Sequence, residues 1–247
     1  MANWNEPQPG RRGFGASPSL NGRAMDRAGT DLGLRRYMLS IYNYMASGVL
    51  LSGVVALLFA RSGMAAQMAG TPLMWIVALA PLGVVMAMSF GAAKMQTSTI
   101  QILFWTFCVL MGLSLSTVFL VYTGTSIATT FFATSAAFAG LSLVGYTTKR
   151  SLSAMGSFMA MGVVGLLVAM LINIFLKSSG LQMAISLLGV LIFAGLTAYD
   201  TQRLKEQYHQ LAGTDFVGKA VVLGALSLYL DFINMFQFLL AFMGDRR

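Results

Sequence analysis

Long apolar runs repeat along the chain, and they constrain its fold more than any other feature of the sequence. Only 10% of the residues are charged, against roughly 25% in a soluble domain. A helix needs about 20 residues to cross ~30 Å of hydrocarbon. Windows of that length fall at 38–60, 73–93, 100–122, 126–146, 154–176, 181–201 and 218–243. The sequence therefore predicts an all-α integral membrane protein with seven transmembrane helices.

The first 36 residues differ from the rest, because they are polar and rich in glycine, proline and arginine. They lack the apolar run and the small-residue cleavage site of a secretory signal. We expect a disordered basic tail at 1–36 and a seven-helix transmembrane domain at 37–247. The net charge of +8 gathers in this tail and at the ends of apolar runs. It therefore indicates membrane orientation, with the lipid bilayer as partner and no nucleic acid.

The number of lysine and arginine residues alternates between high and low from one loop to the next. The tail and the loops on its side hold most of them, whereas the opposite loops hold only Arg61 and Lys177 before the chain end. Because cytoplasmic loops carry the excess of basic residues, we expect the amino terminus in the cytoplasm. Seven crossings would put Arg246 and Arg247 on the far side, against the same rule. The pattern leaves the side of the carboxyl terminus undecided.

Two of the eight acidic residues fall in apolar segments, outside the tail, the loops and the terminus. Asp200 ends the sixth apolar run, and Asp231 lies in the middle of the seventh. An ionisable residue at bilayer depth costs ~2.5 to 3.5 kcal/mol on insertion scales, so function is the usual reason for it. Ser227, Asp231 and Asn234 share one helix face, and Thr197 shares a face with Asp200.

The two aspartates are candidates for a proton-sharing pair. Sequential helices tend to be neighbours, and two carboxylates in a poorly hydrated place cannot both ionise cheaply, so we expect one proton between them. The proton would tie the helices together, and the closed state would be lost as pH rises and the proton leaves. In the alternative, Asp200 is an interfacial acid paired with Arg203 or Lys205. Contact between the aspartates also requires a sixth helix that runs beyond 201 or a seventh that begins outside the membrane.

Two segments resemble the Bax inhibitor-1 family, also called the transmembrane Bax inhibitor motif family. They are Thr197-Ala-Tyr-Asp-Thr-Gln202 and Leu226-Ser-Leu-Tyr-Leu-Asp-Phe-Ile-Asn-Met-Phe236. The resemblance covers residues 31–247, and Tyr146-Thr-Thr-Lys-Arg-Ser-Leu-Ser153 is similar to bacterial members. It implies a multi-pass protein of the bacterial inner membrane. It also implies a seven-helix fold in which the last helix is central and surrounded by the other six.

The resemblance further implies a pH-sensitive calcium leak gated by an aspartate pair, which maps onto Asp200 and Asp231. These carboxylates would bind calcium transiently, and no cofactor is expected. Relatives place a basic residue near the cytoplasmic end of the second helix, where Lys94 is the nearest candidate. An acidic residue that some relatives carry earlier in that helix is missing, since 73–93 contains no Asp or Glu. The residues that would support the pore or gate are Thr197, Ser227, Asn234 and Lys94.

Two other classes of function stay open. Some bacterial relatives bind and restrain a membrane-anchored ATP-dependent protease, so the alternative is a membrane interaction protein that regulates such a protease or a stress response. Paired aspartates on consecutive membrane helices also occur in intramembrane aspartyl proteases. There the second aspartate follows a Gly-x-Gly motif, whereas here Leu228-Tyr-Leu230 precedes Asp231. With one histidine, one cysteine and no Walker-type phosphate loop, we expect neither an enzyme nor an ATP-driven pump.

Overall fold

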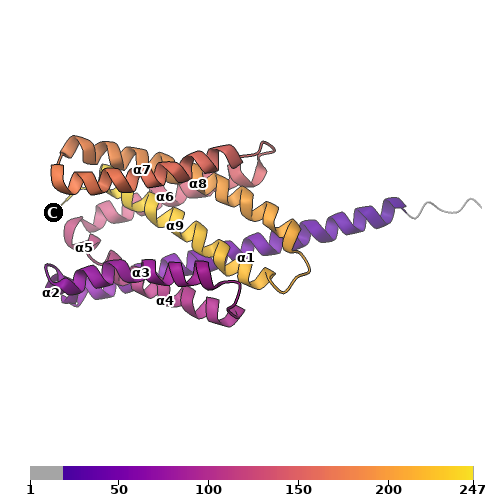
Figure 1. The fold of residues 1–247 in the computed structure, drawn as a ribbon, viewed down its shortest axis with the longest axis horizontal. Coiled ribbons are helices and arrows are strands. Elements are labelled where there is room, and N and C mark those ends of the chain that lie inside the picture. Colours follow the sequence, from indigo (N-terminus) through magenta and orange to yellow (C-terminus); the bar gives the residue numbers. More distant parts are fainter. Residues whose placement is uncertain (1–18, 247) are drawn as a thin grey trace, which may run out of the picture.

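The computed structural model describes residues 19–246, which form a bundle of long helices (Figure 1), and it describes side-chain surroundings from Leu32 onward. Among the described residues, seven helical segments are long and apolar enough to cross a membrane. This confirms the predicted fold class. In chain order the helices are α1 (Ser19–Arg61), α2 (Met64–Met68), α3 (Pro72–Gly91), α4 (Thr97–Leu115), α5 (Val118–Val121), α6 (Gly124–Thr147), α7 (Ser153–Leu176), α8 (Ser179–Leu211) and α9 (Val217–Met243).

Two helices extend beyond the predicted apolar windows. α1 begins at Ser19, inside the expected tail at 1–36, and residues 1–18 of that tail lie outside the described residues. α8 ends at Leu211, well beyond the predicted apolar window at 181–201. The residues that follow Thr201 are mostly polar, but most of them are strong helix formers, so the helix continues after the apolar run ends. Gly213, with a φ of 82°, then adopts the left-handed conformation that ends the helix and turns the chain toward α9.

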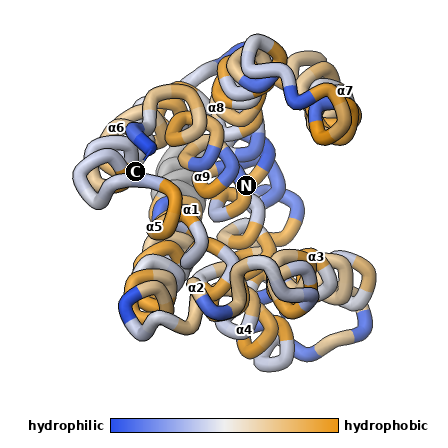
Figure 2. Tube along the Cα trace, turned by 90° about the vertical axis from the view of Figure 1, so that its left-hand side faces the viewer, coloured by the Kyte–Doolittle hydropathy of each residue, from blue (hydrophilic) through white to orange (hydrophobic). Residues whose placement is uncertain are grey.

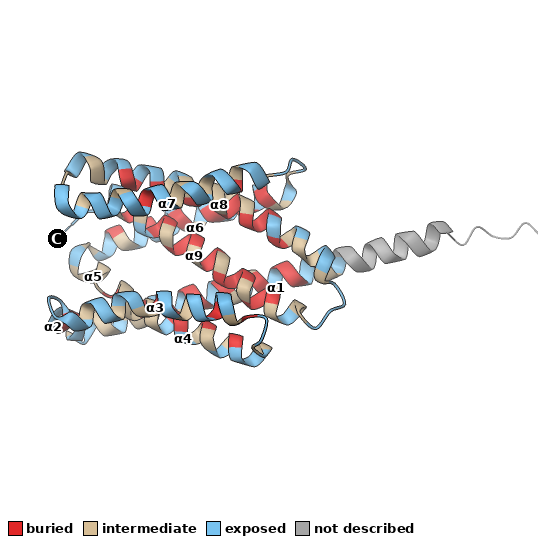
Figure 3. Cartoon of the chain, in the orientation of Figure 1, coloured by how far each residue is buried: buried red, intermediate tan, exposed pale blue. Residues whose placement is uncertain are grey.

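α9 runs diagonally through the bundle and is its most deeply buried span (Figures 1 and 3). In its most apolar window 50% of the residues are buried, against no more than 33% in the other spans. Its main contacts are with α1, α4, α6 and α8. α3 packs on α4 and α7 packs on α8, both at the periphery (Figure 2). Four of the six neighbours expected around the last helix are therefore in contact with it, and the complete ring stays a prediction.

The outer faces of the bundle are exposed (Figure 3) and largely apolar (Figure 2). α7 shows this most clearly, because its large exposed side chains include Phe158, Val164, Leu167, Leu171 and Phe175. A water-soluble monomer rarely exposes a contiguous apolar surface larger than a few hundred Å². The exposed faces therefore suit a hydrocarbon solvent, as the composition predicts.

The turns between helices lie at two ends of the bundle. We call the end with the α3–α4, α6–α7 and α8–α9 turns the inner end, and its predicted cytoplasmic location stays a prediction. The outer end carries the α1–α2 and α7–α8 turns and the carboxyl terminus (Figure 1). There the Asp245 amide donates to the Ser126 hydroxyl at 2.9 Å, and Arg246 forms an isolated bridge with Tyr122. α9 therefore traverses the bundle completely, which settles the end at which the carboxyl terminus lies.

Candidate functional site

Asp200 and Asp231 lie on α8 and α9, whose halves nearer the inner end run alongside each other (Figure 1). Both side chains are inside the bundle, because the two residues expose only 7% and 5% of their surface. The length of α8 explains this position. The helix continues to Leu211, so Asp200 does not mark its end. Contact between the two aspartates required a helix that runs beyond residue 201, and α8 does so.

The Asp200 carboxylate has a partner at each oxygen. The Ser227 hydroxyl of α9 donates a hydrogen bond to Oδ2, and Nη1 of Arg203 lies 3.7 Å from Oδ1. The Arg203 side chain is 52% exposed, so the guanidinium approaches the carboxylate from the solvated side. Lys205, the other cation considered for Asp200, instead donates to the Tyr146 carbonyl at 2.8 Å. Asp200 therefore contacts both Arg203 of its own helix and Ser227 of α9.

Asp231 has fewer polar neighbours than Asp200. Its Oδ2 is buried and has no hydrogen-bond partner among the described residues, and its carboxyl lies within electrostatic reach of both Asp200 and Arg203. A buried carboxylate oxygen without a donor is costly in a low-dielectric interior. A proton on either carboxyl would neutralise one of the two charges. Proton sharing between the two carboxyl groups stays a prediction.

The other predicted residues divide into two groups. Ser227 and Thr197 lie at the level of the aspartates, although the buried Thr197 hydroxyl donates to a carbonyl of its own helix. Asn234 lies farther toward the outer end of α9, and it also bonds to its own helix. Lys94 is exposed in the turn after α3. The basic group next to Asp200 is Arg203, and support of a gate by Lys94 stays a prediction.

A cavity of about 300 Å³ opens beside this site between α3, α8 and α9. Ser89, Arg203, Gln207 and Ser227 supply its polar lining. Sequence reasoning treated Arg203 only as a partner that would make Asp200 an ordinary interfacial acid. The spacing of the two residues, three positions apart on one helix face, was the signal that the guanidinium could belong to the site.

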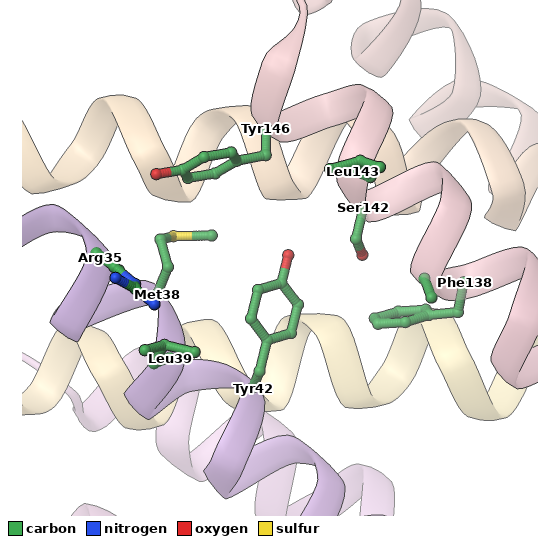
Figure 4. Close-up of a pocket in the computed structure, with 9 residues that line it drawn as sticks. Arg35, Met38, Leu39, Tyr42, Phe138, Ser142, Leu143 and Tyr146 are labelled. Carbon is green, nitrogen blue, oxygen red and sulfur yellow. The ribbon is translucent and has the colours of Figure 1, made fainter.

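A second large cavity lies between α1 and α6 and has a volume of about 540 Å³ (Figure 4). Its lining is mainly apolar, with polar groups from Arg35, Tyr42, Ser142 and Tyr146. Figure 4 shows the Tyr42 ring between the two helices with its hydroxyl directed toward α6. This lining contains no acidic residue, so the cavity does not share the proton chemistry of the aspartates.

Comparison with known proteins identifies the family of the chain. The family model described as "Inhibitor of apoptosis-promoting Bax1" matches residues 34–247. A protein of Caulobacter vibrioides is 50% identical over 238 residues, which cover 90% of this chain and 94% of the relative. A protein of Rickettsia prowazekii is 50% identical over 219 residues, covering 88% and 92%. The inner membrane protein YbhL of Escherichia coli is 42% identical over 219 residues, covering 87% and 94%. The chain belongs to the Bax inhibitor-1 family of membrane proteins.

Proposed function

We propose that this protein is a pH-sensitive calcium leak channel of the bacterial inner membrane, gated by Asp200 and Asp231. The observation that carries the proposal is a pair of buried carboxyl groups on adjacent helices, one of which has an oxygen without a donor. One shared proton neutralises half of the pair and holds α8 against α9. The inner membrane location named for the Escherichia coli relative supports the choice of membrane.

The direction of the pH response follows from the charge of the pair. At low pH the shared proton is present and the helices stay together, so the channel is closed. As pH rises the proton leaves, and two negative charges remain in an environment that screens them poorly. Their repulsion favours separation of α8 from α9. The closed state is therefore lost as pH rises.

Calcium suits the oxygen chemistry of the site as a passing ion. Among the described residues, no group of three His, Cys, Asp or Glu side chains comes together. A calcium ion would meet the two carboxylates and the neutral oxygens of Thr197, Ser227 and Asn234. Tight calcium sites use about six to eight oxygen ligands, so this smaller set favours passage over retention.

Calcium uptake into proteoliposomes, followed with a trapped fluorescent indicator over a range of pH, tests the proposal. We expect uptake by the unmodified protein to increase with pH, and we expect Asp200→Asn and Asp231→Asn to lose that dependence. Asp215→Asn is the matched control, because Asp215 is exposed in the turn between α8 and α9. The gate is refuted if both aspartate variants keep the uptake and the pH profile of the unmodified protein.

A further inference from the structure

One face of α9 differs from the rest of the helix. Between Ala220 and Gln237 the side chains that are not buried follow a single line, with spacings of four and three residues. These five residues, which we call the α9 stripe, are Leu223, Ser227, Leu230, Asn234 and Gln237. Such spacing places them on one side of the helix. Three of the five are polar, although α9 is the most buried membrane-length helix among the described residues.

Separate cavities adjoin the two halves of the α9 stripe. The inner cavity is the one of about 300 Å³ beside Asp200, and Ser227 and Leu230 line it. An outer cavity of about 360 Å³ lies between α7, α8 and α9, where Gln182, Asn234 and Gln237 provide amide groups. Polar side chains at membrane depth must find protein partners or water. Cavities of this size with several polar groups have room for water.

The outer cavity continues to the end of the bundle. It shares Gln182 and Ala241 with a further cavity of about 520 Å³, which is also lined by Asn173, Lys177 and Arg246. The chain of cavities therefore runs from the outer end to the depth of Asn234. Its interior groups are neutral amides, whereas the charged groups at its mouth are basic.

Leu230 lies on the α9 stripe where the inner cavity and the outer cavity come closest to each other. It lines the inner cavity, and Asn234, which lines the outer cavity, is one turn or ~6 Å farther along the helix. The Asn234 amide donates to the Leu230 carbonyl at 2.8 Å, so these two residues are joined along the helix. The next residue after Leu230 is Asp231 of the carboxyl pair. The apolar interruption of the cavities therefore lies at the level of the aspartates.

We propose that the α9 stripe lines an ion path made of an inner and an outer water-filled vestibule, with the Leu230 side chain as the apolar constriction between them. Apolar constrictions close pores by excluding water. The identification of calcium as the permeating ion rests on the proposed function. The existence of the two vestibules does not depend on it. The neutral amide oxygens of Gln182, Asn234 and Gln237 suit a partly hydrated cation. Lys177 and Arg246 at the outer mouth repel cations and keep the flux low.

Cysteine accessibility tests the two vestibules without a measurement of ion flux. Gln237→Cys and Ser227→Cys are made in the full chain and treated with a charged, membrane-impermeant thiol reagent from one side of oriented vesicles at a time. The controls are Leu171→Cys and Val164→Cys, which lie on the exposed apolar face of α7. Leu171 is about as far from the outer end as Gln237, and Val164 is about as far from the inner end as Ser227. Cys108 is buried, and the unmodified protein gives its background labelling.

We expect the reagent to modify Gln237→Cys only from the outer end and Ser227→Cys only from the inner end. Both α7 controls should stay unmodified. At low pH, addition of Leu230→Asn should make Gln237→Cys reactive from the inner end as well, whereas Leu230→Met should preserve the sidedness. Protection of Gln237→Cys from both ends, or unchanged sidedness with Leu230→Asn, overturns the proposal. Sided labelling in a protein that passes no calcium would instead overturn the proposed function and leave the vestibules standing.

The basic mouth gives a second measurement. Exchange of both Lys177 and Arg246 for glutamine should increase the initial rate of calcium uptake about threefold at low ionic strength, with a smaller increase at high salt. Arg61→Gln is the control, because Arg61 is an exposed basic residue near the same end that lines none of these cavities. An equal increase in the control, or no increase in the double variant, contradicts entry through this mouth.

Discussion

The Ser227 hydroxyl on α9 donates a hydrogen bond to Oδ2 of Asp200 on α8. This bond joins residues 27 positions apart and crosses the contact between the two helices that carry the proposed gate. A hydrogen bond to a carboxylate favours its charged form over its protonated form. Ser227 therefore influences how readily the aspartate pair releases its proton.

Ser227→Ala should raise the pH at which the channel opens. Without the donor, the pair keeps its proton to a higher pH, and the closed state persists with it. Hydrogen bonds to charged groups contribute ~1.5 to 3 kcal/mol, and ~1.4 kcal/mol corresponds to one pH unit. We expect the midpoint of calcium uptake against pH to increase by about one to two units.

The control for this variant is Ser186→Ala on α8. The Ser186 hydroxyl is buried and donates to the Gln182 carbonyl of its own helix at 2.9 Å, so it does not reach the aspartate pair. This control should keep the midpoint of the unmodified protein. A midpoint that stays constant or decreases in Ser227→Ala would show that the hydroxyl does not act on the proton of the pair.

Arg203→Gln should also raise the opening pH, but by less. Nη1 of Arg203 lies 3.7 Å from the Asp200 carboxylate and favours its charged form, while the half-exposed guanidinium is screened by solvent. We expect an increase of about half a pH unit at low salt, which disappears at high salt as the Debye length shortens. Lys205→Gln is the control, because Lys205 bonds to the Tyr146 carbonyl. A shift that does not respond to salt would contradict an electrostatic role.

The seven spans and the inward position of Asp231 could be predicted because hydropathy and helix-face spacing are local properties. The position of Asp200 could not be predicted in the same way. It depends on where α8 ends, and hydropathy reports only where the apolar run ends. Residues 202–211 are mostly polar and still helical, so the loss of hydropathy at 201 marks no helix terminus.

Contacts between residues far apart in the chain also could not be predicted from the sequence. Ser52 and Tyr229 are 177 positions apart, and neither residue type nor spacing identifies them as partners. The same holds for the α9 stripe. Ser227 and Asn234 were predicted to share a face with Asp231, but Asp231 is buried whereas Ser227 and Asn234 stay partly exposed beside the cavities. Only the packing of α1, α4, α6 and α8 around α9 separates these positions.

Tyr229→Phe should reduce the stability of the bundle. Ser52 Oγ lies 2.7 Å from the Tyr229 hydroxyl and 2.7 Å from the Cys108 carbonyl. The Ser52 and Tyr229 hydroxyls share a buried hydrogen bond in which either oxygen can be the donor. Loss of this buried bond between α1 and α9 costs about 1 kcal/mol, or a decrease in Tm of ~2 to 4 °C for a chain of this size.

Thermal unfolding in detergent measures that decrease. Tyr42→Phe is the matched control, since its hydroxyl lies in the cavity between α1 and α6 (Figure 4). We expect the control to keep the Tm of the unmodified protein. If Tyr229→Phe has the same Tm as the unmodified protein, the hydrogen bond between Ser52 and Tyr229 does not stabilise the fold.

Gly145→Ala should move α8 relative to α6, displace Asp200 from its position against α9 and so open the gate at low pH. A Cβ at Gly145 would collide with the backbone carbonyl of Ala198, which lies two residues before Asp200. Backbone cannot rotate away as a side chain can, so the helices must move apart at a cost of about 1 to 3 kcal/mol. Gly140→Ala on the same helix is the control, because a Cβ there meets open space and alanine favours the helix by ~1 kcal/mol. We expect a lower Tm and a calcium leak at low pH in Gly145→Ala alone. The same Tm and the same low-pH uptake in both variants would show that the close approach of α6 does not hold Asp200 in position.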